Sequence, residues 1–324
     1  MPMLRFVPAL VAGVLALALA SAQAAPYPER PIRLLVPYPP GGTTDVMARA
    51  MQDPLSKILG QPIVVENRAG AAGTIAAREV AKAAPDGYTL LFSNDGPGVI
   101  APLIQKHAGY DAQKSFTPIT LVATQPMIMV VNAAVPVTDL KSFVAYAKTQ
   151  TKPLLYAHAG SGSSGHLTTE LFAQTAGISL AAVPYKGSSV TTLGVMNGEV
   201  QVLITTSTPT MLDYIRTGKL KLIGMSTLSP EALPPGTPLI SDVYPDFKQD
   251  NWFGVLGPAG LPAEIRDKLN AALRTVVAAP ELRRLFEASG FIPMTSTPDE
   301  LARIIDTNSD LWKRVIAEAK ITED

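Results

Sequence analysis

Short apolar runs rich in β-branched residues alternate with longer stretches of helical period in the first third of the chain. This pattern predicts strands at residues 31–38, 62–66 and 88–93, and helices at residues 45–59 and 74–83. Strands joined by helices need right-handed crossovers, which place the strands parallel in one sheet with helices on both faces. The first third therefore predicts an α/β unit.

The same alternation starts again after residue 116. A β-prone run at residues 119–132 is interrupted by Pro126 and is too long for one ordinary strand, so we interpret it as the chain crossing into a second domain. Further strands are expected at residues 154–158, 182–185, 200–205 and 219–226, and helices at residues 142–149 and 166–176. Residues 252–257 are a candidate return crossing, and amphipathic helices are expected at residues 262–278, 281–289 and 298–319.

These elements favour an α/β fold of two doubly wound domains joined by a two-strand hinge, with a ligand in the cleft between the domains. The expected division is a signal peptide at residues 1–24, a discontinuous first domain at residues 25–125 plus 252–324, and a second domain at residues 126–251. Two crossings that act as a hinge would let such a cleft close around its ligand.

The first residues have the pattern of a secretory signal peptide. Arg5 precedes an apolar stretch at residues 6–20, and Ala22-Gln23-Ala24 fits a small-x-small cleavage site. We therefore expect export to the periplasm and removal of the first 24 residues. Because the chain contains no Cys, we expect neither a lipid anchor at the cleavage site nor a disulfide framework.

Charge and residue counts argue against several classes of function. The 27 Lys and Arg residues balance the 27 Asp and Glu residues, without the basic face of a nucleic-acid-binding protein, so no nucleic-acid partner is expected. The three His residues lack metal-binding spacing, and we expect neither a metal nor a cofactor. An anionic ligand would have to be held by local dipoles.

Two loops share one design that suits an anion. Residues 39–45 (PPGGTTD) and residues 159–166 (AGSGSSGH) each join a predicted strand to a predicted helix. In open parallel sheets ligands bind where such loops lie, and each loop ends at a helix N-terminus with unpaired N–H groups and partial positive charge. Either loop alone also fits an ordinary turn with a helix cap, but one on each predicted domain favours a carboxylate held from both sides.

Other polar segments follow predicted strands at the same sheet edges. Ser93 and Asn94 end the third strand, and Tyr185 and Lys186 follow a strand of the second domain. Lys186 could meet a ligand carboxylate or be a solvated surface residue. Residues 66–74, rich in Gly and Ala, could line the cleft or serve packing and capping.

Two enzymatic interpretations are disfavoured. Gly160, Gly162 and Gly165 match a dinucleotide fingerprint, but no acidic residue follows at the end of the next strand to hold a ribose. Ser161 and His166 lie too close in sequence for a hydrolase nucleophile and base without a third orienting group. We therefore do not expect an enzyme.

Several motifs in combination resemble one family. They are Tyr27-Pro28 with Arg30-Pro31-Ile32, Val36-Pro37-Tyr38-Pro39-Pro40-Gly41-Gly42 with Asp45, Val64-Val65-Glu66-Asn67-Arg68, Pro85-Asp86-Gly87-Tyr88, Gly160 with Gly162-Ser163 and His166-Leu167, Val183-Pro184-Tyr185-Lys186-Gly187, and Trp252-Phe253-Gly254. From about residue 27 to the C-terminus the chain resembles the Bug family, the receptors of tripartite tricarboxylate transporters. The resemblance implies a type II periplasmic-binding fold, a monomer, a small carboxylate ligand, and a membrane permease partner of one large and one small subunit.

The resemblance also implies site residues. In the family, backbone amides of the two Gly-rich loops hold one ligand carboxylate, partly through ordered waters. The matching positions are Tyr38, Gly41, Gly42, Thr43, Thr44 and Asp45, and Gly160, Ser161, Gly162, Ser163 and His166. Since like charges repel, Asp45 is expected to cap the helix and order the loop or its waters rather than contact a carboxylate.

The chain departs from the family pattern where ligand choice is set. Tyr38 stands where Phe is usual, and Thr205 and Thr206 stand where the family commonly has Asp. Loss of an acid should ease binding of a second anionic end, so we expect a dicarboxylate, with aromatic ones among the candidates. The same cleft would equally serve a ligand-sensing partner of a receptor kinase, and a secreted hydrolase is the least favoured alternative.

Overall fold

The computed structural model describes residues 27–185, 188–227, 229, 233 and 235–322. The predicted signal peptide at residues 1–24 and the candidate residue Lys186 lie outside these ranges. No helix among the described residues has both the length and the hydropathy needed to cross a membrane.

The first half of the fold is a sheet in the order β2-β1-β3-β9-β4. Its strands are β1 (Ile32–Val36), β2 (Ile63–Asn67), β3 (Thr89–Asn94), β9 (Asp250–Pro258) and the first part of β4 (Phe116–Asn132). The helices beside it are α2 (Thr43–Leu59), α3 (Thr74–Ala81), α9 (Ala263–Ala278), α10 (Pro280–Ala288) and α11 (Pro298–Ala319). Strand side chains alternate, so Leu34 and Leu35 enter different core clusters on the two faces of the sheet.

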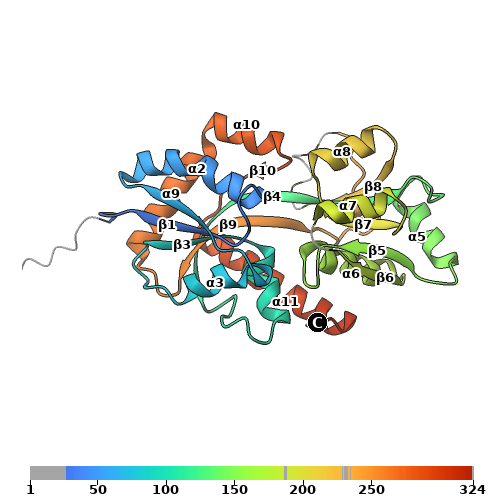
Figure 1. The fold of residues 1–324 in the computed structure, drawn as a ribbon, viewed down its shortest axis with the longest axis horizontal. Coiled ribbons are helices and arrows are strands. Elements are labelled where there is room, and N and C mark those ends of the chain that lie inside the picture. Colours follow the sequence, from blue (N-terminus) through green and yellow to red (C-terminus); the bar gives the residue numbers. More distant parts are fainter. Residues whose placement is uncertain (1–26, 186–187, 228, 230–232, 234, 323–324) are drawn as a thin grey trace, which may run out of the picture.

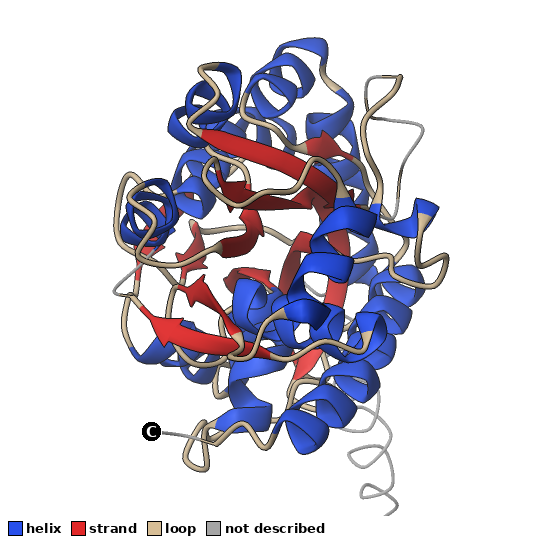
Figure 2. Ribbon diagram, turned by 90° about the vertical axis from the view of Figure 1, so that its right-hand side faces the viewer, coloured by secondary structure: helices blue, strands red, loops and turns tan. Residues whose placement is uncertain are grey.

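The second sheet has the order β6-β5-β7-β4, and β8 also pairs with β4. Its own strands are β5 (Leu154–His158), β6 (Leu180–Pro184), β7 (Val202–Thr206) and β8 (Leu220–Ser226). Its helices are α5 (Leu140–Thr149), α6 (Ser164–Ala176), α7 (Ser188–Met196) and α8 (Pro209–Arg216). Figure 2, which looks from the side of this sheet, shows helices on the outside and strands within.

β4 belongs to both sheets. Its residues from Phe116 to Pro126 pair antiparallel with β9, and those from Met127 onward pair antiparallel with β7 and β8. Pro126 lies at the changeover, opposite the first residue of β9, Asp250. In Figure 1, β4 and β9 run between the two sheets. The crossing expected at residues 119–132 is therefore one continuous strand of 17 residues, longer than ordinary strands because it serves two sheets.

The predicted elements are found within a few residues of their positions, but parallel pairing is incomplete. β1, β2 and β3 pair in parallel, as do β5, β6 and β7, whereas β4, β8 and β9 run antiparallel. The sequence pattern did not predict the helices α7 and α8, the short strand β10 (Ile292–Pro293), a π-helical turn at Gly96–Ile100, or the 3-10 turns at Ala71–Gly73 and Ile240–Asp242. A helical turn α4 (Ala101–Ile104) continues the π-helical turn.

The predicted start of the last helix is confirmed. The Thr297 hydroxyl accepts a hydrogen bond from the Glu300 N–H at 3.2 Å, and the Glu300 carboxylate accepts one from the Thr297 N–H at 2.8 Å. This capping box satisfies two N–H groups at the helix end, with Pro298 as the first helical residue.

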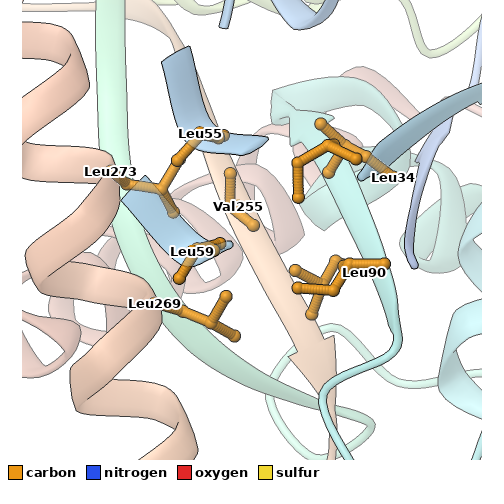
Figure 3. A pocket seen from close by; sticks show the side chains of 9 residues that line it. Leu34, Leu55, Leu59, Leu90, Val255, Leu269 and Leu273 are labelled. Atoms are coloured by element: carbon orange, nitrogen blue, oxygen red, sulfur yellow. The ribbon is translucent and has the colours of Figure 1, made fainter. Parts of the chain in front are cut away.

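A small void lies inside the core of the first sheet. Figure 3 shows leucines of β1, β3, α2 and α9 around Val255 of β9. Its volume is about 10 Å³ and its lining is apolar, so it is a packing defect at the limit of one water molecule. It offers no room for a ligand.

Candidate functional site

A cavity of about 760 Å³ lies where the two sheets meet. It is lined from the first sheet and its loops by Tyr38, Pro39, Gly42, Thr43, Thr44, Ala72, Asn94, Gly96, Asn251 and Phe253, and from β4 by Gln125 and Met127. From the second sheet and its loops it is lined by His158, Ala159, Gly160, Ser161, Gly162, Ser163, Ser164, Gly165, Thr191, Leu203, Ile204, Thr205 and Thr206. Its size is that of a small-molecule binding site.

The cavity brings most of the predicted site residues together. Those on its wall are Tyr38, Gly42, Thr43, Thr44, Asn94, Gly160, Ser161, Gly162, Ser163, Thr205 and Thr206. Gly41, Asp45, Ser93, His166 and Tyr185 are not part of the wall. Gly41 and Asp45 bond to each other within the first loop, His166 accepts from the Gly162 N–H within the second, and Ser93 is fully buried in β3.

Tyr185 lies away from the cavity because its strand does. β6 is the edge strand of the second sheet, farthest from β4 in the strand order. The Tyr185 hydroxyl donates to the Glu199 carboxylate at 3.0 Å, and the ring packs against Gly194.

The first Gly-rich loop is ordered by a buried carboxylate. The Asp45 side chain is 4% exposed and accepts hydrogen bonds from the Gly41 N–H at 2.8 Å, from the Arg49 guanidinium at 2.9 Å and from the Asn67 amide at 2.9 Å. Burial raises the pKa of Asp45, but these hydrogen bonds outweigh it and the pKa lies below its ordinary value. Asp45 thus orders the loop, as expected, although Gly42 and not Asp45 is the cap residue of α2.

The second loop is ordered by a histidine and a serine. The Gly162 N–H donates to Nδ1 of His166 at 3.2 Å, and Ser163 caps α6 by accepting from the His166 N–H. The His166 ring stacks on His158 with centroids 4.2 Å apart and planes 16° apart. The loop therefore has a fixed backbone at the N-terminus of a helix of 13 residues.

The helix ends give the cavity an anion-binding character. The N-terminal residues of α2 (Thr43, Thr44) and of α6 (Ser164, Gly165) line the cavity from opposite sheets. Unpaired N–H groups in the first turn of a helix, with the helix dipole, attract anions. None of the described lining residues is Asp, Glu, Lys or Arg, so the described part of the wall would present a carboxylate with dipoles rather than a counterion.

Three amide side chains line the cavity, those of Asn94, Gln125 and Asn251, and the sequence pattern predicted only Asn94. Gln125 and Asn251 are 3% and 7% exposed and stand opposite each other in the β4–β9 pairing. The side-chain oxygen of Asn94 accepts a hydrogen bond from the Tyr38 hydroxyl at 2.8 Å. Burial raises the pKa of Tyr38 to about 12. A signal was present, since Gln125 is an amide in the middle of a long and mostly apolar run.

Between the cavity-lining residues Asn94 and Gly96 the chain contains a buried acid. Asp95 is 1% exposed and accepts a hydrogen bond from the Asn308 amide at 3.1 Å. Burial raises its pKa to about 7, against the lowering effect of Asn308 and the Trp252 indole, and the Asp250 carboxylate raises it further. Among the described residues, no cluster of three or more His, Cys, Asp or Glu side chains could hold a metal ion.

Comparison with known proteins gives one consistent result. Residues 47–321 match the family model described as "Tripartite tricarboxylate transporter family receptor". The protein BugT of Bordetella pertussis is 34% identical over 294 residues, which are 90% of each chain. Two solved structures are similar throughout. "R. palustris Rpa4515 with adipate" is 31% identical with a TM-score of 0.77, over 91% of this chain and 99% of the other. "MatC (Rpa3494) from Rhodopseudomonas palustris with bound malate" is 29% identical with a TM-score of 0.73, over 90% and 100%.

Proposed function

Because the chain belongs to the tripartite tricarboxylate transporter receptor family, we propose that it is a periplasmic receptor that captures a small dicarboxylate and delivers it to a membrane permease. The permease has one large and one small subunit, and the receptor works as a monomer. Capture occurs by closure of two domains, residues 25–125 plus 252–324 and residues 126–251, about the crossing strands.

One observation carries this proposal. The N-terminal turns of α2 and α6, each preceded by a Gly-rich loop, line one cavity from the two sheets. A carboxylate between them would accept backbone and hydroxyl hydrogen bonds from both, and a ligand that contacts both sides favours the closed arrangement. Thr205 and Thr206 offer hydroxyl groups in place of an acid at the same cavity, which suits a second anionic end.

The ligands of the two similar structures, adipate and malate, are both dicarboxylates and support the same class here. We include aromatic dicarboxylates, since a cavity of about 760 Å³ has room for a ring. Membership of a receptor family also favours binding of the ligand without its chemical conversion. A ligand-sensing partner of a receptor kinase would use the same site, and uptake measurements in a deletion strain separate it from transport.

The test begins with the full chain expressed with its own N-terminus and purified from the periplasm. Mass spectrometry checks that the purified chain starts at Ala25. Thermal-shift screening against aliphatic and aromatic mono-, di- and tricarboxylates follows, then calorimetry on each hit. A bound ligand at a hundredfold excess over Kd should stabilise the fold by about 2.7 kcal/mol. If no carboxylate shifts the melting temperature, the proposed function is wrong.

A matched pair of glycine variants locates the binding. Gly162 has φ +76°, and a Cβ there would lie 2.7 Å from the Ile104 side chain, so Gly162→Ala should distort the second loop and weaken binding. Gly218 has φ +73° with no atom within 4 Å and lies outside the cavity wall. Gly218→Ala should cost similar backbone strain and leave Kd unchanged.

A further inference from the structure

Three amide side chains come from the three central strands of the fold. Gln125 of β4 and Asn251 of β9 are directly opposite each other, and Asn94 of β3 is opposite Phe253, two residues along β9 from Asn251. Opposite residues point to the same face and residues two apart on a strand share that face, so all three amides face one side. All three line the cavity, and each is more than nine-tenths buried.

Asn94 and Gln125 each use one atom of the side-chain amide in a hydrogen bond within the protein, so the second polar atom of each amide remains for a ligand. The Tyr38 hydroxyl donates to Oδ1 of Asn94 at 2.8 Å, which directs the Asn94 NH₂ group elsewhere as a donor. Nε2 of Gln125 donates to the Ser207 carbonyl at 3.2 Å, which leaves Oε1 of Gln125 as an acceptor.

Asn251 is the amide whose side-chain oxygen has no partner among the described residues. Its Oδ1 is buried and accepts no hydrogen bond from any described residue. Buried polar atoms in folded proteins nearly always have partners, and an unpartnered oxygen at a cavity wall marks a place where a water or a donor group of a ligand completes the bonding. The Asn251 side chain lies beside Gln125 and diagonally across from Asn94, so one small group could reach all three.

We propose that Asn94, Gln125 and Asn251 form a second ligand subsite, which takes the second carboxylate of the dicarboxylate while the two Gly-rich loops hold the first. This inference rests on the proposed function. The N–H groups of Asn94 and Asn251 can bind a carboxylate as charge-assisted donors without a cation. The side-chain oxygens of Gln125 and Asn251 only accept, so each needs a water or a ligand hydroxyl beside the carboxylate.

The subsite would also connect ligand binding to β4 and β9, the two strands that run between the sheets. Gln125 and Asn251 lie within two residues of the Pro126–Asp250 changeover, and the Gln125 amide holds the carbonyl that follows β7. A second carboxylate bound here would contact both crossings at once. The distance between the two carboxylates of a ligand would then decide whether the second one reaches the place where the two sheets join.

The experiment compares acids that differ only by the second carboxylate. Calorimetry is done with adipate against hexanoate and with terephthalate against benzoate, on the full mature protein and on Asn251→Leu and Asn94→Leu. The wild type should prefer the dicarboxylate of at least one pair by about tenfold or more, since a charge-assisted hydrogen bond commonly contributes that much. In both variants this preference should fall below about threefold, with Kd for the monocarboxylate nearly unchanged.

Controls separate the subsite from folding and from the proposed function. Asn197→Leu changes an exposed amide outside the cavity and should keep the wild-type preference. If Asn251→Leu does not fold, Asn251→Asp keeps the shape and should weaken the dicarboxylate more than the monocarboxylate by like-charge repulsion. Carboxylate binding with an unchanged preference in both subsite variants overturns the subsite alone. Failure of all four acids to bind overturns the subsite and argues against the proposed function as well.

Discussion

The backbone N–H of Gly162 donates to Nδ1 of His166, so the loop that faces the cavity is tied to the ring behind it. That ring stacks on His158, which itself lines the cavity at the end of β5. The serine-rich loop is therefore held by an imidazole pair packed on the sheet, and its backbone shape depends on a side chain that is not part of the cavity wall.

Replacing His166 should loosen this loop. His166→Phe keeps an aromatic ring against His158 but removes the acceptor of the Gly162 N–H, and we expect Kd for a carboxylate ligand to rise about fivefold to twentyfold. The measurement is calorimetry with the best ligand of the screen. His107→Phe changes an exposed ring and is the matched control. Equal affinity of the two variants would show that the Gly162 bond does not shape the site.

Asp45 should contribute to stability in a pH-dependent way. Asp45→Ala removes the acceptor of the Gly41, Arg49 and Asn67 hydrogen bonds, and we expect a loss of about 2 kcal/mol in unfolding free energy at pH 7. The pKa of Asp45 is lowered in the folded state, so this contribution is present above the ordinary Asp pKa and is lost as the pH falls below it.

Urea unfolding of Asp45→Ala and the wild type at pH 7 and pH 3 measures that difference. The gap between the two proteins should narrow at the lower pH. Asp53→Ala, which removes an exposed carboxylate of the same helix, should show little gap at either pH. A gap that stays constant with pH would mean that Asp45 acts by packing rather than by charge.

The start of α6 depends on a glycine that approaches a neighbouring strand. A Cβ on Gly165 would lie 2.6 Å from the Ile204 carbonyl oxygen of β7, so Gly165→Ala must push α6 off the sheet. We expect a loss of about 1–3 kcal/mol in stability together with weaker ligand binding, because Gly165 and Ile204 both line the cavity. Thermal unfolding and calorimetry measure the two effects. Thr175→Ala, on the exposed side of the same helix, should change neither.

Asp95 should lower stability as the pH rises. Its folded pKa of about 7 lies above the unfolded value near 4, so the folded state binds more protons between these values. Unfolding free energy should therefore fall from about pH 4 to pH 7 and then level off. Asp95→Asn keeps an oxygen that can accept from Asn308 and removes the buried charge, so it should raise the melting temperature more at pH 8 than at pH 5.

The control for Asp95→Asn is Asp246→Asn, which changes an exposed carboxylate outside the cavity wall. Its melting temperature should follow that of the wild type across the pH range. Should Asp95→Asn lower the melting temperature at pH 8, the ionised carboxylate of Asp95 would be stabilising, contrary to this reasoning.

Local patterns were enough to predict what neighbours in sequence determine. The start of the last helix at residue 298, the two Gly-rich loops and the strand alternation each follow from residues a few positions apart. Asp45 could be assigned to ordering its loop because a carboxylate four residues from Gly41 cannot bind a like charge. These features need no knowledge of the strand order.

The rest depends on strand pairing, which the sequence does not display. Gln125 and Asn251 become neighbours only through the register of β4 on β9, and a slip of one residue would turn one of them to the opposite face. Tyr185 and Asn94 both lie at the end of a strand, yet the strand order places β6 at an edge and β3 beside β9. Proximity to a strand end therefore predicted a cavity-lining residue only where that strand is central.

The continuous strand β4 has a consequence for how the protein melts. Its residues contribute hydrogen bonds to both sheets without an intervening loop, so neither sheet can lose its order without fraying a strand that also belongs to the other. Multidomain chains often unfold in separate steps when only flexible linkers join their parts. Here the two halves share one continuous strand, and we expect heat to melt them as a single cooperative unit.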